Sequence, residues 1–266
     1  MMIKGVQNIH RYKGFVFGSV KREFQLRYQN SLFGAAWTII NPIAMIFVYT
    51  VIFSQVMRAK LPGTDTMFAY SIYLCAGIIT WSLFAEIIER GQSIFIDNAN
   101  ILKKLNFPRR ILPIIVVLTA CLNFSIIFLL FICFLLISGN FPGEVCLAII
   151  PVLIIQILFS IGLGISLGVL NVFFRDVGEL FKILLQFWFW LTPIVYPVTI
   201  LPEFLRPIML TWNPMAAIIA SYQTILVKGL YPDWSTLIIP LLSSILLCLI
   251  ALRLFKNHAD EIVDEL

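Results

Sequence analysis

Charged residues are scarce in this sequence. Only 12% of its 266 residues are Asp, Glu, Lys or Arg, whereas 60% are hydrophobic and the mean hydropathy is +0.96. A soluble domain of this length could not bury so much apolar surface in one core. The composition therefore excludes a water-soluble globular protein and predicts that lipid surrounds most of the chain.

The sequence also lacks the parts of a nucleotide-binding or catalytic site. No Gly-x-x-x-x-Gly-Lys-Ser/Thr loop is present, so we expect this chain neither to bind nor to hydrolyse ATP. The acidic residues expected on the outer side are scattered over different loops, which argues against a glycosyltransferase or hydrolase. They are Asp65, Glu144, Glu203 and Asp233. We expect no enzyme activity, no metal site and no cofactor in this chain.

Neither cysteine pairs nor an ion relay can be recognised. Four of the five cysteines lie inside apolar runs and Cys146 lies at an outer edge, so no disulfide framework is indicated. Ion-coupled transporters usually carry ionisable residues deep in their spans. Because most of the apolar runs of this chain contain none, the sequence argues against a proton or sodium relay.

Six apolar runs are present, separated by polar segments or by segments with proline and glycine. They cover residues 32–56, 70–84, 111–137, 147–174, 181–196 and 236–252. A transmembrane helix needs about 20 residues, so we extend the second run to about Ile88, with Glu86 and Arg90 reaching toward the interface. The predicted fold class is an all-α integral membrane protein, with six transmembrane helices in one domain over residues 32–256.

The basic residues predict the orientation of the chain. Six spans place both termini on one side, and that side holds 15 of the 19 Lys and Arg residues. The other side holds the remaining four, Arg58, Lys60, Arg206 and Lys228. Because cytoplasmic loops carry the excess of basic residues, we expect both termini to be cytoplasmic, including a tail over residues 257–266.

The first segment outside the spans is an N-terminal helix within residues 1–31. Its apolar residues recur at helical spacing and its polar residues fall on the opposite side, which predicts an amphipathic helix in the membrane plane. The apolar face contains Phe17, Val20, Phe24 and Tyr28, and the polar face contains Lys21, Arg22, Gln25 and Gln29. The helix either only anchors the chain to lipid phosphates, or it also steers a substrate with a phosphate-bearing head toward the first span.

A second segment outside the spans connects the second and third runs on the cytoplasmic side. We predict a short helix at about residues 94–106, ended by the Asn-Phe-Pro sequence at 106–108. Its apolar face contains Ile94, Ile101, Leu102 and Leu105. The helix either docks into a separate ATPase and transmits its closure, or it only ties the two spans together.

The third segment, residues 198–234, is too apolar for a solvated loop and too rich in proline for a full span. Two short helices at about residues 200–230 that dip into the membrane fit it better. Irregular backbone at that depth is tolerated only where it is buried in protein or lines a cavity. The segment therefore predicts a gate over an outward exit, with a merely interfacial loop as the alternative.

Aromatic and small residues mark two further faces. Aromatic rings stack on sugar rings, so aromatic-lined helices could form a path for a polysaccharide, although lipid contact is the alternative for each ring. The candidates are Trp37 and Tyr49 in the first run, and Phe187, Trp190 and Tyr196 in the fifth. Gly164 and Gly168 form a small face on the fourth run, which predicts close helix packing.

Several of these segments resemble the permease subunits of the ABC-2 class of exporters, in particular those for O-antigen, capsule and teichoic acid polymers. Residues 21–43 are similar to the family's basic interface helix and first span, and residues 98–113 to its coupling helix. Residues 171–180 resemble its cytoplasmic Phe-Arg-Asp turn. Residues 190–197 and 212–219 resemble its fifth span and outer gate helices.

The resemblance implies a homodimer in the bacterial inner membrane with two copies of an ATP-binding subunit, which would carry ATP and Mg. It implies export of an undecaprenyl-diphosphate-linked glycan, O-antigen by closest similarity, whose diphosphate would meet Lys21, Arg22 and Arg27. The alternative substrates within the family are capsule, teichoic acid, a drug or a lipid. A membrane scaffold or assembly protein is the alternative from a different functional class. The residues expected to couple to the ATPase are Asn98, Ile101, Leu102, Lys103, Lys104, Phe107 and Arg109.

Overall fold

The computed structural model describes residues 13–27, 33–56, 61, 68–104, 109, 111–258 and 261–265, and these contain helices but no strands. The shorter helices are α2 (Lys13–Arg27), α3 (Trp37–Tyr49), α5 (Ala99–Lys104), α8 (Asp176–Leu191), α9 (Leu205–Trp212), α10 (Pro214–Gln223) and α12 (Glu261–Glu265). The longer helices are α4 (Ala69–Asp97), α6 (Ile111–Ile137), α7 (Ile149–Phe173) and α11 (Ile238–Asn257). The prediction of an all-helical chain is confirmed for these residues.

Among the described residues, four helical segments are long and apolar enough to cross a membrane. They are Ala69–Asp97, Ile111–Ile137, Gly143–Phe173 and Trp234–Asn257, and Trp37–Phe53 forms a shorter apolar helix. In α8, which corresponds to the predicted fifth span, the first turn carries Asp176 and Glu179. Its 16 residues cover about 24 Å, less than the roughly 30 Å of a hydrocarbon core.

Helix α4 is longer than the sequence predicted. The predicted end near Ile88 is wrong, because the helix continues to Asp97. The extension is stabilised by packing, since Ile94 and Phe95 are buried beside residues of α6 and α7. The predicted helix at about 94–106 is therefore divided: its first residues belong to α4, and α5 begins at Ala99.

Glycines let α4 and α7 approach closely. A Cβ atom added to Gly91 would lie 3.0 Å from backbone atoms of Gly164, and one added to Gly168 would overlap the carbonyl oxygen of Gly91. On the far side of α7, a Cβ atom on Gly162 would lie 2.8 Å from the backbone nitrogen of Cys248 in α11. The close packing predicted for Gly164 and Gly168 is confirmed.

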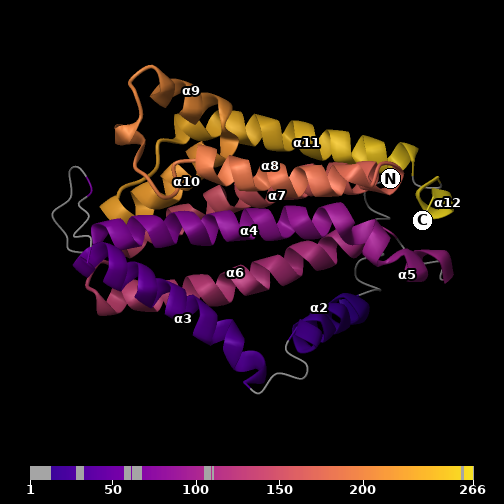
Figure 1. Ribbon diagram of the computed structural model, residues 1–266, viewed down its shortest axis with the longest axis horizontal. Coiled ribbons are helices and arrows are strands. Elements are labelled where there is room, and N and C mark those ends of the chain that lie inside the picture. Colours follow the sequence, from indigo (N-terminus) through magenta and orange to yellow (C-terminus); the bar gives the residue numbers. More distant parts are fainter. Residues whose placement is uncertain are drawn as a thin grey trace.

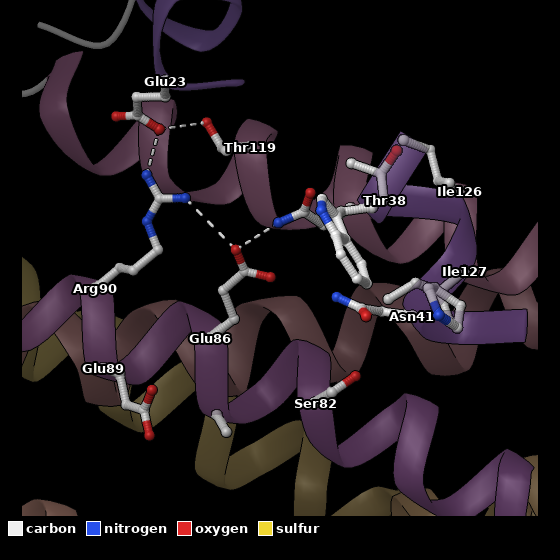
Figure 2. Close-up of a pocket in the computed structure, with 14 residues that line it drawn as sticks. Glu23, Thr38, Asn41, Ser82, Glu86, Glu89, Arg90, Thr119, Ile126 and Ile127 are labelled. Carbon is white, nitrogen blue, oxygen red and sulfur yellow. Dashed lines mark hydrogen bonds and ion pairs between the residues drawn. The ribbon is translucent and has the colours of Figure 1, made fainter. Parts of the chain in front are cut away.

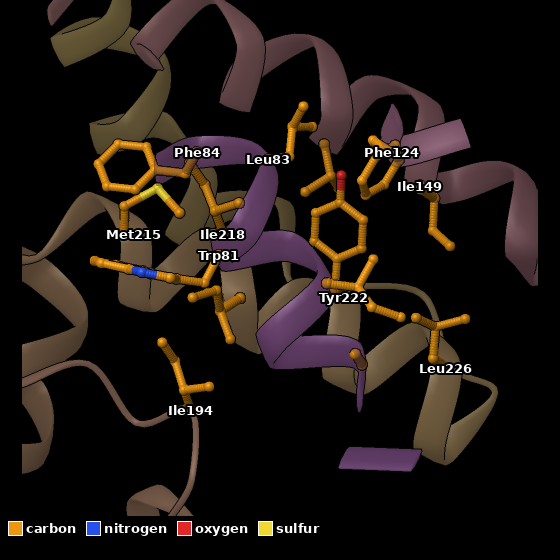
Figure 3. Close-up of a cluster of buried hydrophobic side chains, with 14 of the residues drawn as sticks. Trp81, Leu83, Phe84, Phe124, Ile149, Ile194, Met215, Ile218, Tyr222 and Leu226 are labelled. Carbon is orange, nitrogen blue, oxygen red and sulfur yellow. The ribbon is translucent and has the colours of Figure 1, made fainter. Parts of the chain in front are cut away.

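The largest hydrophobic cluster among the described residues extends from α10 along α4, α6 and α7, and Figure 3 shows part of it. Met215 and Tyr222 of α10 are fully buried; Met215 lies beside Trp81 and Phe84 of α4, and Tyr222 lies beside Phe124 of α6. Helix α9, by contrast, is largely exposed, with Trp212 at 82%. Two short helices therefore occupy the segment where the sequence predicted them, but only the second enters the bundle.

Helix α3 is tilted away from the bundle. Its C-terminal end lies beside the start of α4, whereas its N-terminal end lies far from α4 (Figure 1). Helix α2 lies beside the N-terminal part of α6, where Val16 and Val20 pack against Ile111 and Ile115. The space between α2, α3, α4 and α6 contains the site described next.

Candidate functional site

A polar pocket of about 810 Å³ lies between α2, α3, α4 and α6. Figure 2 shows its polar side chains, which come from all four helices. The lining consists of Glu23, Trp37, Thr38, Asn41, Pro42, Ser82, Ala85, Glu86, Glu89, Arg90, Thr119, Asn123, Ile126 and Ile127. Its volume falls within the range of about 300–1,000 Å³ that is usual for ligand sites.

A network around Arg90 forms one wall of this pocket. The Arg90 guanidinium forms an ion pair with Glu23 of α2 and lies 3.5 Å from the Glu86 carboxylate one turn earlier in α4. Helix α6 adds two hydrogen bonds: the Thr119 hydroxyl donates to Glu23 at 2.9 Å, and the Asn123 amide donates to Glu86 at 2.7 Å. The network joins three helices through charged groups.

Glu86 and Arg90 both face the pocket and pair there. The sequence predicts that the two side chains reach toward the membrane interface, but it did not predict that they pair with each other. Pairing is favoured because the free-energy cost of an unpaired charge near lipid is roughly several kcal/mol higher than that of a hydrogen-bonded pair. Two signals could have found the network: the four-residue spacing of Glu86 and Arg90, and Glu23 as the only acidic residue in the first 60.

The basic face of α2 lies mostly outside the pocket. Lys21 and Arg22 are exposed, and Arg22 lines a smaller adjoining pocket of about 340 Å³. The side chain of Arg27 lies outside the part that the structure describes. The predicted apolar face is also divided, because Val20 is buried against α6 whereas Phe17 is 71% exposed.

Helix α5 is attached to the chain's own core. Leu102 is buried among Ile94, Phe95 and the fully buried Ile262 of α12. The Asn98 amide donates to the carbonyl oxygen of Ile94 at 2.8 Å and so stabilises the break between α4 and α5. Leu102 and Asn98 therefore hold α5 in place, and their part in coupling to the ATPase stays a prediction.

The other residues predicted for coupling differ in their surroundings. Lys103 is exposed, Ile101 is half-buried and lines the smaller pocket, and Arg109 is half-buried. Phe107 and the side chain of Lys104 lie outside the described residues. Among the α5 side chains that the structure describes, Lys103 is the exposed one predicted for coupling.

Asn213 organises the end of the bundle that contains α10. Its side-chain oxygen accepts from the backbone N–H groups of Met215 and Ala216, at 3.2 and 3.3 Å, and so caps α10. The same oxygen accepts from the Trp188 indole at 2.9 Å, and its amide donates to the Thr192 hydroxyl at 3.0 Å. One side chain therefore connects α8, α10 and the turn between α8 and α9. The Asn-Pro pair that begins α10 was the available sequence signal.

Tyrosines of α4 fix the chain that follows α8. The Tyr70 hydroxyl donates to the carbonyl oxygen of Val195 at 2.6 Å. The Tyr73 hydroxyl lies 3.0 Å from the carbonyl oxygens of both Pro193 and Tyr196. Three carbonyl groups of this irregular segment are therefore hydrogen-bonded within the protein, as polar backbone groups at membrane depth require.

Comparison with known proteins places the chain in a family. Residues 16–227 match the ABC-2 type transporter family. This chain belongs to that family. The resemblance seen in the sequence is thereby confirmed, and the chain is a multi-pass permease subunit without an ATPase domain of its own.

Relatives of this ABC-2 permease include O-antigen export permeases and a polysialic acid transport protein. It is 31% identical over all of its length to the O-antigen export system permease protein RfbA of Myxococcus xanthus, the whole of which is covered. It is 32% identical to the protein of the same name from Klebsiella pneumoniae, over 89% of this chain and 88% of the relative. It is 20% identical to the polysialic acid transport protein KpsM of Escherichia coli, over 91% and 92%.

In the part of this ABC-2 permease that the structure describes, the aromatic residues proposed as a glycan path form two separate sets, one on α3 and one on α8 and the turn that follows it. Trp37 lines the polar pocket, and Tyr49 lies at the other end of α3. Phe187 and Trp190 are more than half exposed on α8, where the Tyr196 hydroxyl donates to the carbonyl oxygen of Trp190 at 3.0 Å. Helix α3 packs mainly on α6, and α8 mainly on α7 and α4.

Proposed function

We propose that this chain forms the transmembrane path of an ATP-driven exporter that moves undecaprenyl-diphosphate-linked O-antigen across the bacterial inner membrane. The observation that carries the proposal is the similarity to O-antigen export permeases over the full length of the chain. Both termini lie in the cytoplasm in this proposal, in agreement with the excess of basic residues on that side.

The working unit in this proposal is a homodimer with two ATP-binding subunits. Large apolar side chains are exposed on α6, α7 and α11 as well, where lipid can cover them. The dimer contact is assigned to α3 and α8 because aromatic rings are among their exposed side chains. These exposed side chains include Ile43 and Phe47 of α3, and Ile183, Phe187 and Trp190 of α8. A second copy that places α8 beside the partner's α3 would bring the two aromatic sets together along one glycan path. It would also cover the exposed face of α8. Although α8 is short, it counts as one of the six spans in this proposal.

Force from the ATPase enters through α5. A push on Lys103 and the neighbouring Arg109 would pass through Leu102 into α4, because α5 is packed against the end of that helix. Helix α4 then acts on α2 through Arg90 and Glu23. The far end of α4 bonds to the segment at 193–196, so the same helix connects the ATPase side to the outer gate formed by α9 and α10.

Deletion and complementation in the producing bacterium test this function. We expect loss of surface O-antigen on gels of lipopolysaccharide, accumulation of the glycan inside the cell, and rescue by the wild-type gene. A Lys103→Glu chain should insert normally but restore export poorly. Loss of capsule with normal lipopolysaccharide would favour the second candidate, a capsule exporter, which the similarity to the polysialic acid transport protein supports.

A further inference from the structure

The charge of the polar pocket does not suit a phosphate group. Its lining contains three carboxylates, Glu23, Glu86 and Glu89, and one guanidinium, Arg90, so its formal charge is −2. Arg90 is already engaged with two of the three. An anion in this pocket would be repelled on balance, because carboxylates outnumber cations in the lining.

A metal ion does not suit the pocket either. The carboxylates come from two helices, and Arg90 lies between Glu23 and Glu86 (Figure 2). Within the described part of the chain, no group of three His, Cys, Asp or Glu side chains is arranged to hold a metal ion. The pocket therefore has negative groups that are kept apart.

The remaining lining suits a ligand with many hydroxyl groups. Carboxylates accept hydrogen bonds from hydroxyls, and the amide of Asn41 can both donate and accept. The hydroxyl of Ser82 donates to the carbonyl oxygen of Ile79 at 2.8 Å, so it offers a ligand an acceptor. Trp37 adds an indole ring one helical turn before Asn41, so the ring and the amide lie on the same face of α3. The ring is held by an edge contact to Phe33, with centroids 5.7 Å apart. An aromatic face beside planar polar groups is the usual lining for a sugar ring.

We infer that the pocket between α2, α3, α4 and α6 binds sugar units of the lipid-linked glycan and excludes its diphosphate. The inference rests on the proposed function and adds a site for the sugar that is separate from any site for the diphosphate. The adjoining smaller pocket is lined by Arg22 and Asp97 and shares Glu23 and Arg90 with the polar pocket, so its formal charge is 0, against −2 for the polar pocket. The diphosphate is placed on that side, next to Arg22, while the first sugars occupy the polar pocket.

A binding experiment on the permease–ATPase complex in lipid nanodiscs tests the inference. The probe is the repeat-unit oligosaccharide released from the bacterium's own O-antigen, followed by saturation-transfer NMR. Asn41→Leu and Glu89→Gln should each weaken binding about fivefold to tenfold, the effect of losing one or two hydrogen bonds. Both residues are exposed, so the melting temperature should not change. Glu144→Gln, at an exposed acidic residue in another part of the molecule, is the matched control and should bind normally.

Three results would overturn the inference: unchanged affinity in both pocket variants, displacement of the oligosaccharide by inorganic pyrophosphate, or binding of the lipophilic cation tetraphenylphosphonium in place of the oligosaccharide. The same complexes are assayed for glycan export in liposomes. If the wild type exports glycan but the pocket variants bind it normally, the sugar site is wrong and the proposed function stands. If the wild type exports no glycan, the proposed function itself is wrong.

Discussion

Some single side chains connect several helices at once, and Asn213 is the clearest example. It combines a helix cap with bonds to Trp188 and Thr192. Asn213→Leu removes the cap and leaves two polar groups without their partner, so we expect a loss of about 2–3 kcal/mol. The apparent melting temperature of the purified chain should fall.

Asn213→Asp is the matched control. It keeps the oxygen that caps α10 and receives the Trp188 indole, but it loses the bond to Thr192. Its melting temperature should therefore lie between those of the wild type and Asn213→Leu. Equal melting temperatures for all three proteins would show that the contacts of Asn213 add nothing to stability.

Glycine at position 168 is required by packing. Gly168→Ala places a methyl group on the carbonyl oxygen of Gly91 and must separate α4 from α7, at a cost of about 1–3 kcal/mol. Gly18→Ala in α2 meets nothing within 4 Å and should be neutral or slightly stabilising. Thermal unfolding of the two purified variants gives the comparison, and a tolerant Gly168→Ala would contradict the close approach of the two helices.

Individual side-chain directions were the part that the sequence could not predict. The run from Phe187 to Trp190 is aromatic at every position, so no polar residue marks which side faces outward. In the structure Trp188 and Phe189 contact Trp81, whereas Phe187 and Trp190 are exposed. A uniformly apolar run has no period from which to deduce this.

At the scale of elements, α5 carries one side chain that packs into the core, Leu102, and one exposed side chain that is proposed for coupling, Lys103. Leu102→Asp puts a carboxylate into a buried apolar cluster and should destabilise the chain and reduce its yield. Lys103→Glu changes an exposed side chain and should leave the melting temperature unchanged. It should nevertheless uncouple the partner, so that substrate no longer stimulates ATP hydrolysis by the complex. Normal stimulation in Lys103→Glu would remove α5 from the proposed coupling route.

The apolar runs predicted the long helices themselves, but they did not predict several of the residues at which these helices end. Local composition suggested that α4 stops near Ile88, because Glu89, Arg90 and Gly91 follow. The helix continues since Ile94 and Phe95 find a buried surface on other helices. Helix α12 was missed for the same reason: its five residues are mostly acidic, and burial of Ile262 against distant residues holds it in place.

At the scale of the whole molecule, the polar pocket was the largest feature missing from the sequence interpretation. Its residues come from four helices between Glu23 and Ile127, and no local pattern connects them. The sequence did contain the residues of the proposed glycan path, but in the described part of one copy they form two separate sets, one on α3 and one on α8 and the turn that follows it. Their meeting is a property of the proposed dimer.

Tryptophan substitutions test the path in that dimer. Trp37→Ala and Trp190→Ala should each reduce O-antigen export severalfold while the chain still inserts, because each removes a stacking surface worth about 1 kcal/mol. Trp234→Ala, at the start of the last apolar segment and away from the path, is the control and should export normally. Surface O-antigen is measured relative to the amount of chain in the membrane. Full export by both path variants would contradict the aromatic path.

The central claim is that this chain, driven by a separate ATPase, carries a lipid-linked polysaccharide across a membrane. The most direct measurement reconstitutes the chain with its ATPase in liposomes and follows the transfer of lipid-linked O-antigen, using an antibody that reaches only one leaflet. The account predicts transfer that requires both subunits and ATP hydrolysis. Transfer by this chain without the ATPase, or no transfer with both subunits and ATP present, would contradict it.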